Sequence, residues 1–253
     1  MQITERAWAK YIEDLRKVND KAARLVLDYL RKNGLPVTRE EINALIEYGY
    51  AVSQTFGEAA ATLSAEMYDA IAMLSDVILA PAVPAEPPLI SEVAKAIVGT
   101  SKTGNVEIIS SAIGRLVKQT GVDTTMHNAI RDGAEWAWIP QGDTCMFCIT
   151  LASRGWQRAS KKALNGGHAE HIHANCDCTY AVRFDKESGV KGYDPEKYLK
   201  MYEEADGVKP KDKINAMRRE AYAENKDAIN AQKRDAYAKR MERESSEAEE
   251  LDV

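Results

Sequence analysis

The sequence predicts a mainly α-helical protein with a long N-terminal helical hairpin, then a small α+β domain with a Cys/His metal knuckle, then a charged helical tail. Three observations lead to this class: two long apolar stripes at helical spacing, four cysteines confined to one short stretch, and a repeat of mixed charge near the C-terminus. The 253 residues suffice for one large domain or two small ones. We divide them into residues 1–80, 81–88, 89–190 and 191–253.

Residues 1–80 are expected to form the hairpin. A turn at Gly34 ends the first helix, and Thr38 with Glu41 three residues later predicts a capping box that begins the second. The second apolar stripe covers residues 42–78, and the short turn makes the two helices antiparallel. The first stripe, at alternating steps of three and four residues, consists of Trp8, Tyr11, Leu15, Val18, Ala22, Leu25 and Tyr29.

The four prolines in residues 81–88 predict a stiff linker that separates the hairpin from the next domain. Beyond it, glycines divide three shorter predicted helices, over residues 90–99, 105–119 and 123–135. Trp136–Ile139 and Thr179–Phe184 are predicted to be partner strands of a small sheet. A domain with so few strands benefits from a metal that ties two loops together.

All four cysteines fall in two close pairs, Cys145-Met-Phe-Cys148 and Cys176-Asp-Cys178, the second preceded by His173. Soft donors at this spacing are typical of a zinc site. We expect Cys145, Cys148 and Cys176 to be ligands, with His173 or Cys178 in the fourth position.

Plain buried thiols, a redox pair and disulfides are the alternatives to a metal. Residues 1–6 lead directly into a charged amphipathic segment without the apolar core of a secretory signal. We therefore expect a reducing cytosol, in which thiols stay reduced and a metal is favoured over disulfides.

A basic cluster lies between the two cysteine pairs, around Trp156. Basic side chains beside an aromatic ring suit a nucleic-acid backbone, but they are equally typical of a solvated loop or of a surface for an acidic partner. The cluster consists of Arg154, Arg158, Lys161 and Lys162.

The tail contains an internal repeat, in which Ile214–Ala223 recurs 15 residues later as Ile229–Ala238. This spacing is about four helical turns, so equivalent residues share a helix face. The apolar stripe is thin, which predicts either a solvated helix or one that docks on another subunit.

Composition excludes other classes of protein. A net charge of −5 does not indicate nucleic-acid binding over the whole chain. The longest apolar stretch, residues 71–83, is interrupted by polar residues and too short to span a bilayer, so we expect no membrane partner.

The residues around the cysteines resemble a signature of minor head proteins of tailed bacteriophages, in the VG15-type group encoded beside the portal gene. They are similar, more distantly, to the phage Mu F-like head morphogenesis proteins, which carry a His-Pro-Asn-Cys-Arg-Cys motif. This chain has Ala174 in place of the proline and Asp177 in place of the arginine. The residues that carry the resemblance are Asp143–Cys148, Leu151–Gly155, Ser160, His173–Thr179 and Phe184.

The resemblance implies a phage minor capsid protein that is built into the virion head near the portal after assembly in the host cytoplasm. Its expected partners are the portal protein and the inner capsid surface, with DNA as a further candidate and no small-molecule substrate. The alternative is a capsid maturation protease, in which Cys145 or Cys148 would be the nucleophile and His171 or His173 the base. Because cysteines that ligate a closed metal site cannot attack a peptide bond, we favour binding and assign no catalytic residue.

Overall fold

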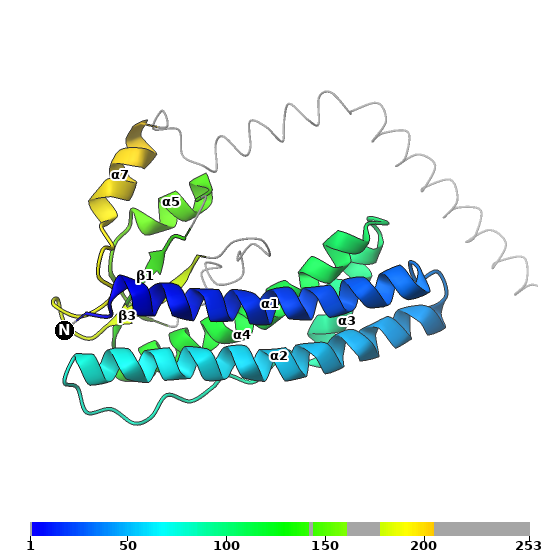
Figure 1. Cartoon of the computed structure of the whole chain (residues 1–253), viewed down its shortest axis with the longest axis horizontal. Coiled ribbons are helices and arrows are strands. Elements are labelled where there is room, and N and C mark those ends of the chain that lie inside the picture. The colour runs from blue at the N-terminus through cyan, green and yellow to red at the C-terminus, as the bar shows by residue number, and fades with distance from the viewer. Residues whose placement is uncertain (1, 142–143, 161–177, 205–253) are drawn as a thin grey trace, which may run out of the picture. The chain divides into compact units, whose positions relative to one another are not determined.

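Two long helices, α1 (Glu5–Asn33) and α2 (Arg39–Leu74), form the predicted antiparallel hairpin (Figure 1). The computed structural model describes residues 2–141, 144–160 and 178–204. Most of the described residues are helical, which confirms the mainly α class. The other elements in these ranges are α3 (Ile90–Ser101), α4 (Val106–Asp132), β1 (Glu135–Ile139), α5 (Met146–Ala152), β2 (Gln157–Arg158), β3 (Thr179–Arg183) and α7 (Pro195–Glu204).

The turn of the hairpin is built as the sequence predicts. Gly34, at φ 83°, ends α1, and its N–H donates to the carbonyl of Leu30 at 2.8 Å. The capping box then begins α2, because the Glu41 N–H donates to Thr38 Oγ1 and the Thr38 N–H donates to Glu41 Oε2. The helix ends at Leu74, earlier than the predicted stripe, and Asp76 follows in a left-handed conformation with φ 55°.

Residues 106–132 form one helix, α4, so the prediction of two helices separated near Gly121 is wrong. Gly121 lies inside α4 and faces α2, where an added Cβ would lie 2.8 Å from Ser64 Oγ and 3.3 Å from the Ala60 carbonyl oxygen. Close packing of two helices therefore explains this glycine better than a helix end does. The helix ends instead at Gly133, whose φ of 67° is the left-handed conformation common after a helix C-terminus.

The hairpin packs against α4 along its length (Figure 1). Both α1 and α2 contact α4, and α3 contacts α2 and α4. The buried apolar residues of these helices and of the sheet belong to one hydrophobic cluster. The sequence predicts a hairpin that is separable at residues 81–88, whereas residues 1–203 form one compact unit.

The first residues of the chain also contact the segment after the sheet. Ile3 forms a parallel bridge with Val190, in which the Ile3 N–H donates to the Gly189 carbonyl at 2.8 Å and the Lys191 N–H donates to the Ile3 carbonyl at 3.0 Å. The hairpin is thus fixed to the cysteine-containing region at its N-terminal end as well as through α4.

The small sheet has the strand order β2-β1-β3, and both pairings are antiparallel. The predicted pairing of the strands at residues 136–139 and 179–184 is confirmed, with Ile139 opposite Thr179 and Trp138 opposite Tyr180. Tyr180 contacts the rings of Trp136 and Trp138 edge-on, each at a centroid distance of 4.6 Å. The two-residue strand β2 was not predicted.

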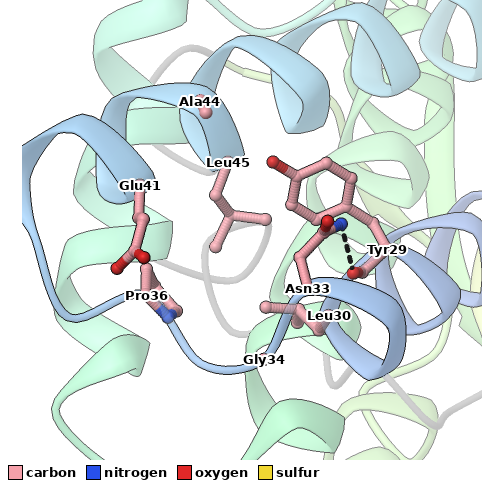
Figure 2. A pocket seen from close by; sticks show the side chains of 8 residues that line it. All are labelled: Tyr29, Leu30, Asn33, Gly34, Pro36, Glu41, Ala44 and Leu45. Atoms are coloured by element: carbon pink, nitrogen blue, oxygen red, sulfur yellow. Dashed lines mark hydrogen bonds between the residues drawn. The ribbon is translucent and has the colours of Figure 1, made fainter.

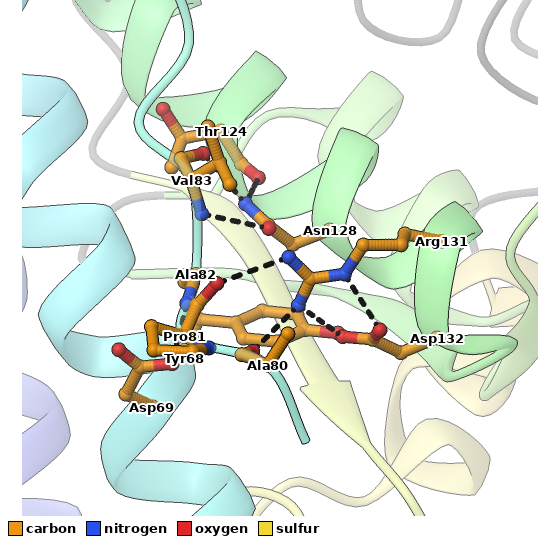
Figure 3. A network of polar contacts seen from close by, with 10 residues as sticks. All are labelled: Tyr68, Asp69, Ala80, Pro81, Ala82, Val83, Thr124, Asn128, Arg131 and Asp132. Carbon is orange, nitrogen blue, oxygen red and sulfur yellow. Dashed lines mark hydrogen bonds and ion pairs between the residues drawn. The ribbon is translucent and has the colours of Figure 1, made fainter.

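Residues 75–89, which we call the strap, connect α2 to α3 and include the predicted linker. They run back along α2 and α4 and are held there by side chains of both helices (Figure 3). Asn128 bonds twice to Val83, accepting from its N–H at 2.9 Å and donating to its carbonyl at 2.8 Å. The N–H of Ala82 donates to Asp69, and that of Ala85 donates to Thr124, each at 2.9 Å.

Arg131 holds the beginning of the strap. Its guanidinium donates to the carbonyls of Ala80 and Pro81 and to the carboxylate of Asp132, which also accepts a 2.8 Å hydrogen bond from Tyr68 (Figure 3). At the other end of the strap, a Cβ on Gly57 would lie 3.0 Å from Pro87 Cβ, so α2 and the strap are in close contact there. Residues 81–88 are therefore packed on the helices along their length.

Among the described residues, no helix combines the length and the apolarity that crossing a bilayer requires. The predicted tail begins at residue 191, and its described part is residues 191–204, which include α7 (Pro195–Glu204). The repeat at residues 214–238 lies outside the described residues.

Candidate functional site

Three of the four cysteines lie in the described part of the chain, around α5 and β3. Cys145 is exposed and precedes α5 as its N-cap residue, and Cys148 lies in the first turn of that helix. Cys178 immediately precedes β3. The side chains of Cys148 and Cys178 are buried, with exposed fractions of 1% and 0%.

The sheet brings both cysteine segments to one of its ends. Because Ile139 is opposite Thr179, the end of β1 lies beside the beginning of β3. The chain leaves β1 toward Cys145, and it enters β3 directly from Cys178. Helix α5 packs on β1, which holds Cys148 at the same side of the domain. The sequence could predict this arrangement from the two strands, but it gave no sign of α5.

Two tyrosines, Tyr180 and Tyr198, have raised pKa values to which the buried thiols contribute. Burial raises the pKa of Tyr180, and the nearby Cys148 raises it further. Burial is also the main cause of the raised pKa of Tyr198, and Cys178 contributes to it. Cys148 and Cys178 are therefore buried away from water, one near Tyr180 and the other near Tyr198, as ligands of a closed structural site are.

The described cysteines do not complete a metal site by themselves. Within residues 2–141, 144–160 and 178–204, no group of three His, Cys, Asp or Glu side chains is arranged to hold a metal ion. Two of the five predicted ligands, His173 and Cys176, lie outside the described residues. Thiolates are donors that suit zinc, so the zinc site stays a prediction for Cys145, Cys148 and Cys178 with these two residues.

The predicted basic cluster is only partly within the described residues. Arg154 and Arg158 are exposed, whereas Lys161 and Lys162 lie outside that part of the chain. Trp156 is half-buried and engaged in packing, with the Arg183 guanidinium 4.9 Å from its ring centroid. DNA contact by the cluster stays a prediction, but the indole ring is not an open platform for a base.

Further ring contacts continue from Trp156 toward α7. The rings of Trp156 and Tyr193 meet edge-on at 5.6 Å, and those of Tyr193 and Tyr198 stack at 6.2 Å. Tyr193 also donates a 2.6 Å hydrogen bond to the carbonyl of Ala152 at the end of α5. These contacts fix α5 and α7 on the domain, and we found no sequence signal for them.

A cavity of about 250 Å³ lies beside these rings. It is bordered by the beginning of α1, the end of β1 and the segment after β3, through residues that include Trp8, Pro140, Lys191 and Tyr198. The indole N–H of Trp8 is buried and has no hydrogen-bond partner among the described residues. The cavity thus combines aromatic walls with the exposed cation of Lys191 and the exposed carboxylate of Glu5.

A second cavity, of about 210 Å³, lies at the turn of the hairpin (Figure 2). Its floor is formed by the buried side chains of Leu30 and Leu45. The polar side chains at its edge are engaged within the turn, since Asn33 donates to the Tyr29 carbonyl and Glu41 accepts from the capping box. This cavity can accept an apolar side chain but has no arrangement of groups for catalysis.

Comparison with known proteins gives one match. A protein-family model described as VG15 protein matches residues 2–205, which is well over half of the chain. No curated protein and no solved structure matches.

Proposed function

The chain belongs to the VG15 protein family, a family of phage proteins, and from this membership we propose that it is a minor capsid protein of a tailed bacteriophage. It acts in head assembly, or in DNA packaging or ejection, by binding other head components. Its partners in this proposal are the portal protein and the inner surface of the capsid. It would be found in the virion head and, during assembly, in the host cytoplasm.

The observation that carries this proposal is the extent of the family match. Residues 2–205 include the hairpin, the strap and the cysteine segments, so the resemblance is not confined to a short motif. The match also ends where the compact unit ends, which indicates that the family shares this unit as a whole.

The burial of the thiols favours binding over proteolysis. A nucleophile must reach the substrate carbonyl, and the side chains of Cys148 and Cys178 are enclosed in the core. Among the three cysteines within the described residues, Cys145 is the exposed one, so a protease would rely on it in that part of the chain. We therefore keep the maturation protease as the alternative that the experiment below must exclude.

We also propose that the cysteines hold a structural zinc ion. The ligands would be Cys145, Cys148 and Cys176, with His173 or Cys178 in the fourth position of a closed site. Bound zinc would link the α5 segment to the entrance of β3, and so stabilise a sheet that has only a two-residue strand at one edge.

Co-expression with the cognate portal protein tests the role directly. The portal should be retained when the tagged full chain is purified, whereas the major tail protein of the same phage should not. Incubation with the unprocessed major capsid protein tests the alternative. Cleavage that is lost in Cys145→Ser, while the circular dichroism spectrum stays unchanged, would replace the binding role by a protease.

A further inference from the structure

The strap and the end of α2 expose large apolar side chains to solvent. Ile78 is 99% exposed, Met73 81% and Val83 63%. At Val83 the cause lies in the backbone, because the N–H groups of Ala82, Val83 and Ala85 donate to Asp69, Asn128 and Thr124 on the helices (Figure 3). The main chain of the strap faces the helices there, and the Val83 side chain is left on the outside.

The same part of the chain is strongly acidic. Residues 40–94 contain nine aspartates and glutamates and no lysine, arginine or histidine. Glu58 and Glu66 are exposed on α2, and Glu86 is exposed on the strap. None of these three takes part in an ion pair within the described residues.

Helical spacing places the exposed groups of α2 on one stripe, and the strap runs beside it. Glu58, Glu66 and Met73 follow one another at eight and seven residues, which is close to two turns each, so they share a stripe of α2. Asp69 lies on the strap side of that stripe, because its carboxylate accepts a hydrogen bond from Ala82 of the strap. We call this surface the acidic apolar face, and it consists of Glu58, Glu66, Met73, Ile78, Val83 and Glu86.

We propose that the acidic apolar face binds a basic amphipathic segment of a protein partner. Exposed apolar side chains bordered by charge are typical of a protein interaction site, and charge of one sign selects a partner of the other. A segment with apolar anchors flanked by Lys and Arg satisfies both conditions. Arg131, a basic side chain that contacts the strap, is engaged with strap carbonyls and with Asp132, so its charge is balanced there and does not offset the acidic charge of the face.

The charge argues against three other occupants. DNA and anionic lipid surfaces would be repelled by Glu58, Glu66 and Glu86. A second copy that presented the same face would meet like charges. Binding at this face does not depend on the portal role, because it requires only that the protein partner has a basic amphipathic segment.

The test uses the full chain and a synthetic amphipathic leucine–lysine peptide, labelled for fluorescence anisotropy. The matched probes are the same peptide with glutamate at each lysine, an oligolysine of equal length, and duplex DNA. We expect binding of the leucine–lysine peptide that weakens with added salt, and at least about tenfold weaker binding of each matched probe.

Two double variants test whether the peptide occupies this face. Ile78→Ser with Val83→Ser, and separately Glu58→Lys with Glu86→Lys, should each weaken binding of the leucine–lysine peptide about tenfold. The control variants Ile108→Ser and Glu187→Lys change exposed residues outside the face and should leave binding unchanged.

Four results would overturn the proposal: equal binding of the glutamate peptide, equal binding of oligolysine, binding insensitive to both double variants, or tighter binding of DNA. Concentration-dependent dimerisation that Ile78→Ser abolishes would assign the face to a second copy instead. Circular dichroism and urea unfolding of each variant separate lost binding from lost folding.

Discussion

Gly121 of α4 and Ser64 of α2 lie so close together that a Cβ on the glycine would be 2.8 Å from the serine Oγ. The backbone carbonyl oxygen of Ala60, one turn earlier in α2, would be 3.3 Å away. Contact this close between α2 and α4 requires a residue without a side chain. The close packing of α2 of the hairpin on α4 therefore depends on Gly121.

Replacing Gly121 with alanine should destabilise the protein. Alanine favours a helix by about 1 kcal/mol over glycine, but overpacking at a helix contact costs about 1–3 kcal/mol. Gly99 of α3 is the matched control, because no atom lies within 4 Å of an added Cβ there. Urea unfolding should show a loss of stability for Gly121→Ala and no loss, or a small gain, for Gly99→Ala. A gain for both would refute the close contact.

Asn128→Ala should loosen the strap. The variant removes both hydrogen bonds to Val83, and unmet backbone groups cost about 1–3 kcal/mol. Limited proteolysis should therefore cut residues 79–85 faster than in the unchanged protein, while the exposed control Asn43→Ala should be cut at the original rate. Equal cutting of all three proteins would mean that these bonds do not hold the strap.

Asp132→Asn should lower stability in a pH-dependent manner. Hydrogen bonds from Arg131, with a further one from Tyr68, hold the pKa of Asp132 below its usual value. Its charge therefore stabilises the folded state above the pKa of the unfolded chain, near 3.9, and this contribution is lost as the pH falls through the lower folded pKa.

The free energy of unfolding of Asp132→Asn should accordingly lie about 1–3 kcal/mol below that of the unchanged protein at pH 7. The difference should shrink as the pH is lowered below 4. Asp20→Asn, at an exposed position of α1, is the control and should change little at either pH. A difference that grows on acidification would contradict the assignment.

The zinc proposal predicts about one equivalent of zinc per chain in protein purified without added metal. Chelation should lower the melting temperature, and re-addition of zinc should restore it. Cys148→Ser should reduce zinc content and stability together, with Ser160→Ala as the control near the same sheet. Fully folded, metal-free protein would show that the cysteines are buried thiols without a metal.

The hairpin could be predicted in detail because its signals are local. Helical spacing of apolar residues, a glycine stop and the Thr38–Glu41 capping box depend on residues a few positions apart. The β1–β3 pairing was also predictable, from two aromatic and β-branched runs. The position of Cys178 beside the end of β1 follows from that pairing.

The rest depends on contacts between distant residues. Gly121 has the sequence signature of a break, and only the approach of α2 shows why it lies within a helix. A continuing stripe through Ile109, Ile113, Val117, Val122 and Met126 was the signal for a single α4. The strap could not be predicted, because its hydrogen-bond partners are single polar residues on helices that are far apart in the sequence.

The proposed role requires this VG15-family protein to be built into the phage head. Quantitative mass spectrometry of purified, DNA-filled heads tests it most directly. We expect the intact chain to be present in few copies relative to the major capsid protein, and to remain with the portal when heads are disrupted. Absence from purified heads that assemble normally with an unchanged, correctly processed capsid protein would contradict it.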